Sequence, residues 1–265
     1  MKAAPHSSRQ AAPPPASDSG TVHRVLRILG CFAEKDRWGL NELARALNLP
    51  RASTHRLLNL CRPLNFVDQD EDGSYRPGLE LYRLAGRLSM DMPITRIAGP
   101  ILEEVRDRTD ETTILTLLVR SELKMFFALT ASPSHPMRYT IRTNVLEPLN
   151  WGATGRVLLA YLTPEEIEET IQRASPSPLD KRPLDEAELR QSLEEIRVAG
   201  YAVTHAQRTP NAVGLAVPFF DARGEVRGNV ALTVPEFRFE PGKQEELLAL
   251  LRHAAADLTR KMGWA

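Results

Sequence analysis

The stretch "LPRASTHRLL", which runs from Leu49 to Leu58, decides the fold of the N-terminal part of the chain. Pro50 suits the first turn of a helix, where its missing N–H leaves no hydrogen bond unmade. Hydroxyl, imidazole and guanidinium groups then crowd together before the sequence turns apolar. Such a composition fits either a catalytic loop or the start of a helix that touches an anionic partner. The apolar face of the predicted helix carries Thr54, Leu57, Leu58, Cys61 and Leu64.

The opposite face of this helix carries polar groups. Ala52, Arg56 and Asn59 lie on it, with Ser53 and His55 on its flanks. The pattern therefore predicts that the polar cluster projects from the exposed side of a helix whose other side is anchored. Ser53 and His55 do not make a catalytic pair, because residues two apart on a helix do not face each other.

The segments around this helix predict a winged helix-turn-helix. Residues 21–33 and 40–47 repeat apolar side chains at helical spacing. After the third helix, Asp72-Gly73 is a strong hairpin signal between short extended segments at 66–69 and 74–77. In a helix-turn-helix, the start of the second motif helix enters the DNA major groove. A helical module that binds protein instead of DNA is the alternative.

Each polar residue has an expected role in DNA binding. Arg56 can reach base edges or phosphate, and the hydroxyls near the helix start can donate to phosphate oxygens. Arg51 adds positive charge, while Tyr75 and Arg76 would let the wing touch the flanking DNA backbone. The predicted DNA-binding residues are Arg51, Ser53, Thr54, His55, Arg56, Asn59, Tyr75 and Arg76.

The distribution of charge is uneven although the formal net charge is zero. Residues 21–65 contain eight Lys or Arg against three Asp or Glu, whereas residues 163–200 contain five against ten. The basic block fits an anionic partner such as double-stranded DNA, or an ordinary solvated surface. The Ala-, Pro- and Ser-rich residues 1–19 predict a disordered tail.

Composition narrows the class of protein further. No apolar run approaches the roughly 18 residues of a membrane-spanning helix, so we expect a soluble, cytoplasmic protein without membrane contacts. Cys31 and Cys61 are expected to be two reduced, buried thiols. The six histidines form no HExxH spacing, the cysteines form no CxxC, and "GATGR" lacks the Lys-Ser/Thr ending of a phosphate-binding loop. We therefore expect no enzyme, no cofactor and no metal site.

The remainder of the chain predicts an α+β domain, in which helices pack on an antiparallel sheet. A connecting helix is expected from residue 79 and ends at Met92-Pro93. Strands and helices then follow in an order that places helices between two groups of strands. The expected strands are 113–120, 124–131, 138–142, 201–207, 214–220 and 229–235, and the expected helices start near residues 94, 155, 164, 186 and 242.

Several stretches, in this order and spacing, resemble the IclR-type bacterial transcriptional regulators from Thr21 to Gly263. They are "LNELARALNLPRASTHRLLNL", "YRPG" with "LELYRLAG", "ATGRVLLAYL", "IRVAGYAVTHAQ" and "GLAVPFFDARGEV". The resemblance implies a winged helix-turn-helix over residues 20–78, a linker helix over 79–92 and a GAF-like effector-binding domain over 93–265. It also implies homodimers, often paired into homotetramers, on palindromic operators.

The resemblance further implies a site for a small carboxylate effector, with aromatic acids among the candidates. The carboxylate would lie against N–H groups of the glycine-rich loop, because a loop that leads into a helix N-terminus presents free donors. Close packing of small residues is the alternative for this loop. A neighbouring tryptophan either stacks on an aromatic ligand or belongs to the core. The implied effector residues are Ala153, Thr154, Gly155, Thr204, Gly214, Ala231 and Trp151.

Two segments depart from the family pattern. Residues Thr204–Asn211 read "THAQRTPN", where the usual pattern is acidic and ends in glycine. We expect Asn211 to keep the left-handed backbone that glycine supplies, and the cavity to be less negative. Asn65 likewise replaces a glycine, and with Pro63 it predicts an early stop of the preceding helix.

Overall fold

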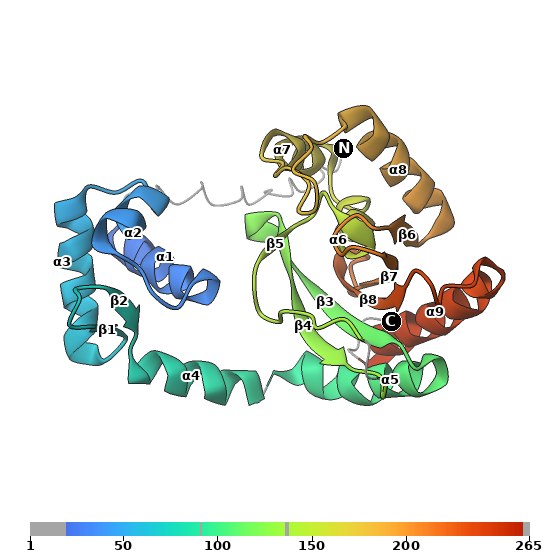
Figure 1. Cartoon of the computed structure of the whole chain (residues 1–265), viewed down its shortest axis with the longest axis horizontal. Coiled ribbons are helices and arrows are strands. Elements are labelled where there is room, and N and C mark those ends of the chain that lie inside the picture. Colours follow the sequence, from blue (N-terminus) through green and yellow to red (C-terminus); the bar gives the residue numbers. More distant parts are fainter. Residues whose placement is uncertain (1–19, 91, 136–137, 262–265) are drawn as a thin grey trace, which may run out of the picture. The chain divides into compact units, whose positions relative to one another are not determined.

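The computed structural model describes residues 20–90, 92–135 and 138–261, so the predicted tail at residues 1–19 lies outside the described residues. The chain divides into two compact units, with the division between Leu88 and Ser89 (Figure 1). The N-terminal unit contains helices and a small hairpin, and the C-terminal unit contains a six-stranded sheet with helices. The α+β architecture predicted from the sequence is confirmed.

The N-terminal unit is a three-helix bundle followed by a hairpin wing. Its core is formed by Ile28, Leu43, Leu57, Leu58 and Tyr75, among others. Ile28 and Phe32 of α1 are four positions apart, and Leu57 and Leu58 of α3 lie four and three positions before Cys61, so each of these helices turns one apolar face inward. The elements are α1 (Thr21–Glu34), α2 (Leu40–Ala46), α3 (Arg51–Cys61), β1 (Val67–Gln69) and β2 (Tyr75–Pro77).

The end of α3 follows the predicted early stop. A single 3-10 turn over Arg62–Leu64 succeeds the α-helix, and Asn65 adopts a left-handed backbone with φ 57°. Asn accepts this conformation more readily than most residues do. The prediction that Leu64 shares the apolar face is wrong, because its side chain is 64% exposed. The tighter 3-10 turn changes the rotation per residue and moves it off that face.

Both cysteines are free thiols, as predicted. Cys61 is buried against the core of the N-terminal unit, whereas Cys31 is only half-buried. Burial raises the pKa of both thiols, since it disfavours the charged thiolate. These cysteines therefore behave as small apolar side chains.

The C-terminal unit is built on one antiparallel sheet with the strand order β5-β4-β3-β8-β7-β6. Helix α4 (Leu79–Met90) precedes it in the chain. The strands are β3 (Thr112–Val119), β4 (Lys124–Ala131), β5 (Glu147–Pro148), β6 (Ala202–His205), β7 (Ala212–Phe220) and β8 (Val226–Pro235). The helices are α5 (Pro93–Thr109), α6 (Gly152–Leu159), α7 (Pro164–Gln172), α8 (Glu186–Ala199) and α9 (Gln244–Lys261).

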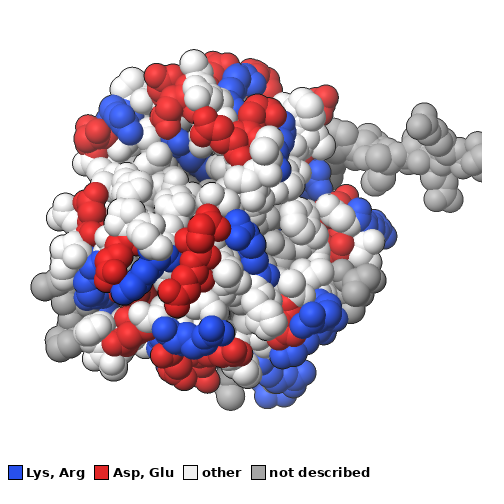
Figure 2. Space-filling view, turned by 90° about the vertical axis from the view of Figure 1, so that its right-hand side faces the viewer, with Lys and Arg blue, Asp and Glu red and all other residues white. Residues whose placement is uncertain are grey.

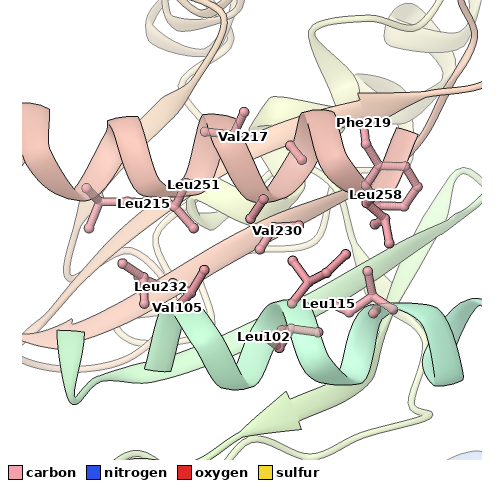
Figure 3. Close-up of a cluster of buried hydrophobic side chains, with 14 of the residues drawn as sticks. Leu102, Val105, Leu115, Leu215, Val217, Phe219, Val230, Leu232, Leu251 and Leu258 are labelled. Atoms are coloured by element: carbon pink, nitrogen blue, oxygen red, sulfur yellow. The ribbon is translucent and has the colours of Figure 1, made fainter. Parts of the chain in front are cut away.

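Helices cover both faces of the sheet. Successive side chains of β3 alternate between them: Leu115 packs with α5 and α9, and Ile114 packs on the side of α6. Figure 3 shows the first of these cores, in which Leu102 and Leu251 from the two helices meet the sheet residues Leu215 and Val230. The second core carries α6, α7 and α8, and it positions the start of α6 against the sheet.

The predicted strand at 138–142 is wrong. Residues 138–142 form no regular structure, and β4 pairs instead with the two-residue strand β5 at its start. The Tyr139 hydroxyl donates to the carbonyl oxygens of Pro210 and Asn211 at 3.0 and 2.7 Å. The segment at 138–142 is thus held to the β6–β7 connection by side-chain hydrogen bonds and not by backbone pairing in the sheet. Asn211 has the predicted left-handed backbone, with φ 53°.

Candidate functional site

The exposed face of α3 carries a cluster of basic and polar side chains. Arg51, His55, Arg56 and Asn59 are exposed and Ser53 is half-buried, while the other side of the helix is anchored in the core. Neither Arg51 nor Arg56 has a hydrogen bond or ion pair within the part of the chain that the structure describes. Their guanidinium groups therefore remain available to an external anion.

His55 and Asn59 lie one helical turn apart on this face. The Asn59 amide nitrogen is 3.4 Å from Nε2 of His55, which is within hydrogen-bond distance. Residues four apart on a helix are surface neighbours, so this contact follows directly from their spacing. The pair holds two polar side chains side by side next to Arg56.

The expectation that the Thr54 side chain contacts phosphate is wrong. Thr54 is completely buried, and its hydroxyl donates to the Pro50 carbonyl oxygen at 3.2 Å. The same oxygen also accepts a hydrogen bond from the Thr54 N–H at 3.0 Å. Thr54 belongs to the anchored face of α3, where it stabilises the first turn of the helix.

The wing also differs from the expectation. Tyr75 is 1% exposed and packs in the core, so the prediction that its side chain touches DNA is wrong. Arg76 is exposed, but its guanidinium lies 2.6 Å from an Asp68 carboxylate oxygen and 2.8 Å from one of Asp70. Arg37 pairs with Asp70 as well, at 2.7 Å. The wing therefore carries carboxylates that neutralise its arginine.

The C-terminal unit contains a cavity of about 260 Å³, which we call the effector cavity because the family resemblance implies an effector at the start of α6. It lies where the start of α6 meets the sheet, the segment around residue 141 and the segment after β6. Its apolar lining includes Ile114, Phe127 and Ile141. Its polar lining includes Thr140, Arg142, Glu147, Thr154, Thr204, Gln207, Arg208, Thr209 and Thr233. The small residues Gly152, Ala153 and Gly214 also line it.

The structure brings part of the predicted effector set together at this cavity and excludes the rest. Ala153, Thr154, Thr204 and Gly214 line it. The three remaining residues, Gly155, Ala231 and Trp151, do not.

Close packing explains the excluded residues. A Cβ on Gly155 would lie 2.5 Å from the Leu149 carbonyl oxygen, so only glycine fits there. Ala231 is buried in the core beneath α6. Trp151 is 1% exposed, and its indole N–H donates to the Ser175 carbonyl oxygen at 2.8 Å. Ala231 and Trp151 therefore belong to the core and do not line the cavity, whereas the assignment of the Gly155 N–H to the effector carboxylate stays a prediction.

The glycine-rich loop is already hydrogen-bonded within the chain. The Ala153 N–H donates to the Thr204 hydroxyl oxygen at 2.9 Å, and the Gly152 N–H donates to Gln207 Oε1 at 3.1 Å. Two of the donors that a helix N-terminus leaves unpaired are thus satisfied by side chains from the β6 region.

Arg208 occupies one wall of the cavity and is the principal group that the sequence analysis missed. It forms an ion pair with Glu147 at 2.9 Å and donates to the carbonyl oxygens of Pro148 and Trp151 at 3.0 and 2.9 Å. Burial lowers the pKa of Arg208, and the Glu147 carboxylate opposes this shift. An arginine stays protonated under such conditions, so the cavity keeps a positive charge.

A signal for these residues was present in the sequence. Gln207 and Arg208 stand in the segment where the family pattern is acidic, and the predicted loss of negative charge there points toward them. Glu147 and Arg142 gave no such signal, because nothing in the local pattern relates them to a segment roughly 60 residues away.

One face of the C-terminal unit carries mixed charge. Figure 2 shows acidic and basic side chains interspersed on the side of α8 and α9. Arg190 of α8 lies 2.7 Å from carboxylate oxygens of both Glu168 and Glu186. A nucleic-acid surface needs clustered positive charge, and this face does not offer it.

Comparison with known proteins agrees with this geometry. Residues 21–71 match the IclR helix-turn-helix domain, and residues 88–260 match the family described as bacterial transcriptional regulator IclR, C-terminal. The chain belongs to the IclR family. It is a DNA-binding transcriptional regulator, and the IclR-type resemblance seen in the sequence is confirmed.

Two IclR-family relatives illustrate the similarity. The transcriptional regulator KipR of Bacillus subtilis is 24% identical over 245 residues, which cover 92% of this chain and 97% of KipR. KdgR of Escherichia coli is 26% identical over 246 residues, which cover 92% of this chain and 93% of KdgR. These relatives are regulators, and the IclR-family chain is not an enzyme.

Solved structures of IclR-family proteins share the fold. A regulator from Silicibacter sp. superposes with a TM-score of 0.83 at 27% identity, covering 93% of this chain and 97% of the other. An IclR homologue from Microbacterium hydrocarbonoxydans, solved in complex with 4-hydroxybenzoate, gives a TM-score of 0.69 at 26% identity, with 90% and 97% coverage.

Two further observations concern the described residues alone. Within residues 20–90, 92–135 and 138–261, no group of three or more His, Cys, Asp or Glu side chains is placed to hold a metal ion. None of the helices in these ranges is both long and apolar enough to cross a membrane.

Proposed function

We propose that this IclR-family regulator binds a palindromic operator as a dimer through α3, and that a small organic acid in the effector cavity changes its operator binding. Aromatic acids are among the candidates. The observation that carries the DNA part is the exposed face of α3, where Arg51 and Arg56 have no partner within the described chain and the opposite face is buried.

The chemistry of this face supports direct reading of DNA. An exposed guanidinium can donate two hydrogen bonds to guanine in the major groove, and Asn59 can pair with adenine edges. We expect Ser53, His55 and Arg51 to contact phosphate or base edges near the helix start. In a dimer, two such helices lie about 34 Å apart, one turn of the duplex.

The cavity supports a small anionic effector. It combines an apolar wall of Ile114, Phe127 and Ile141 with arginine side chains, which suits an organic acid with an apolar body. A homologous structure holds 4-hydroxybenzoate. An acid that prefers one arrangement of the dimer shifts the population of DNA-competent molecules, by a coupling of about 1–3 kcal/mol.

A gel-shift assay with the DNA upstream of the regulator's own gene tests operator binding. We expect a shift that weakens steeply as salt rises, because phosphate contacts release counterions. Absence of a shift at low salt would instead favour a module that binds protein. Analytical ultracentrifugation of the complex measures whether two or four chains occupy the operator.

A thermal-shift screen of the full chain against small carboxylates tests the effector. A ligand that binds the folded state raises the melting temperature according to mass action. The same compounds are then added to the gel shift. An acid that stabilises the protein and leaves operator affinity unchanged would refute its role as an effector.

A further inference from the structure

The start of α6 has lost part of its capacity to bind an anion. In the expected mode, backbone N–H groups of the glycine-rich loop receive the carboxylate of the effector. Among the expected donors, which are the N–H groups of Ala153, Thr154 and Gly155, the Ala153 N–H donates instead to the Thr204 hydroxyl oxygen. The neighbouring Gly152 N–H donates to Gln207 Oε1. A carboxylate could use these donors only by breaking two hydrogen bonds that are part of the folded protein, one of them fully buried.

Arg208 offers a hydrogen-bond donor at the start of α6 that a ligand can use without breaking an existing hydrogen bond. Its Nη1 and Nη2 atoms bond Glu147, Pro148 and Trp151, and these contacts fix the guanidinium in one orientation. Its Nε atom is buried and has no hydrogen-bond partner. This nitrogen lies at the start of α6, since a Cβ added to Gly152 would come within 3.4 Å of it.

A buried N–H without a partner is unusual, because leaving it unpaired costs about 1–3 kcal/mol. Solvent does not reach Nε itself, whereas the Arg208 side chain as a whole is 18% exposed and lines the cavity, so a small movement of this side chain presents the donor to a ligand. The Arg208 guanidinium is also held beside the Phe127 ring, with 6.0 Å between Cζ and the ring centroid. The apolar wall and the anion-binding group are therefore adjacent.

The charges along the cavity select for one negative charge on the ligand. The charged lining residues are Arg142, Glu147 and Arg208, so positive charge exceeds negative charge by one. Arg142 is exposed at the cavity and has no partner within the described chain. A ligand with a single carboxylate balances this excess, whereas a ligand with two carboxylates would leave the cavity with one excess negative charge.

We propose that the effector is a small monocarboxylic acid whose carboxylate is bound by Arg208, with Arg142 at the cavity mouth, in place of the N–H groups of Gly152 and Ala153. This inference rests on the proposed function, in which the cavity is the effector site. Glu147 has two roles in it: it orients Arg208 and it excludes dianions. The apolar body of the acid lies against Ile114, Phe127 and Ile141.

Isothermal titration of the full-length protein tests this inference. The ligands are benzoate, 4-hydroxybenzoate and pyruvate, the neutral amide of each, and the dianion terephthalate. We expect a monocarboxylate to bind, and its amide and terephthalate to bind at least about tenfold more weakly. Arg208→Gln should weaken binding of the acid by roughly 10- to 100-fold and leave binding of the amide unchanged. Arg190→Gln, at an exposed arginine outside the cavity lining, should change neither.

Glu147→Gln is a second variant, which distinguishes a specific loss of binding in Arg208→Gln from a failure to fold. The glutamine oxygen still accepts a hydrogen bond from Arg208 and keeps the guanidinium oriented, while the charge that competes for Arg208 is removed. We therefore expect the acid to bind several-fold more tightly and terephthalate to bind measurably. A misfolded variant could not gain affinity.

The outcomes separate the two proposals. If a monocarboxylate binds and Arg208→Gln binds it as tightly as the wild type, the assignment of Arg208 is overturned and the effector cavity stands. If only dianions or neutral compounds bind, the monocarboxylate class is overturned while a ligand site remains. If nothing binds at millimolar concentration, both the acid effector and the role of Arg208 are rejected.

Discussion

Replacement of Arg56 by alanine tests the central assignment, because the structure predicts separate effects on stability and on DNA binding. The Arg56 side chain is exposed and has no hydrogen bond or ion pair within the described chain. Its removal should therefore change the free energy of unfolding by no more than about 0.5 kcal/mol. Alanine also favours the helix, so α3 should stay intact.

The expected loss of operator affinity is much larger. A guanidinium that pairs with a base edge contributes about 1–3 kcal/mol per site. In a dimer both half-sites lose the contact, so the total is about 2–6 kcal/mol. With 1.4 kcal/mol for each factor of ten, the dissociation constant rises from about 30-fold to about 10⁴-fold. At the upper end, specific binding disappears.

Fluorescence anisotropy with the operator and with a scrambled duplex measures this loss. Thr54→Val is the matched control on the same helix, because the Thr54 hydroxyl is buried and bonds only the Pro50 carbonyl oxygen. That oxygen keeps the Thr54 N–H as a partner, so the variant should fold and bind DNA within about threefold of the wild type.

Two results would refute the reasoning. Arg56→Ala with normal footprints would show that Arg56 does not contact the duplex. Equal loss from Thr54→Val and Arg56→Ala would show that the orientation of α3 toward DNA is different from the one proposed. A loss that is the same on the scrambled duplex would instead assign Arg56 to phosphate and not to a base edge.

Three other predictions concern the C-terminal unit. Gly155→Ala should lower stability by at least about 1–3 kcal/mol in chemical denaturation, because its Cβ would press on the Leu149 carbonyl oxygen; an unchanged midpoint would contradict this packing. Hydrogen bonding to Arg120 lowers the pKa of Glu166 below its ordinary 4.5, so the pair adds stability above pH 4.5 that is lost as pH falls through the lowered pKa. Glu166→Gln should therefore be less stable than the wild type at pH 7, by under about 1 kcal/mol, and equally stable in strong acid; a difference that persists there would exclude this cause. Ala153→Trp fills the cavity, so it should abolish the effector response in gel shifts yet retain operator binding, and a normal response would place the effector elsewhere.

Local sequence patterns determined much of the N-terminal unit. The spacing of apolar residues in α3 placed Leu57, Leu58 and Cys61 inward and Arg56 outward, as the structure shows. The helical period is a property of the backbone itself, so a short window of sequence is enough to assign the two faces. The left-handed backbone of Asn65 and Asn211 was likewise predictable, since it depends on the residue and its immediate turn.

Tertiary packing decided which of the remaining side chains are buried and which are exposed. The helical period already placed Thr54 on the apolar face of α3, while its hydroxyl suggested a phosphate contact; the packed bundle buries the side chain completely and excludes that contact. Tyr75 belongs to a three-residue strand, where alternation cannot tell which side meets the core. Its burial, and the pairing of Arg76 with wing carboxylates, follow from contacts with other segments.

The cavity depended most on the tertiary structure. Family resemblance located the start of α6, but the partners of its N–H groups, Thr204 and Gln207, come from more than 50 residues further along the chain. Arg208 and Glu147 are 61 residues apart and meet only because the sheet brings the two segments together. Sequence alone therefore determined the family, the order of elements and the exposed face of α3. Which donor is left free for a ligand was decided by competition among distant side chains, which no local period encodes.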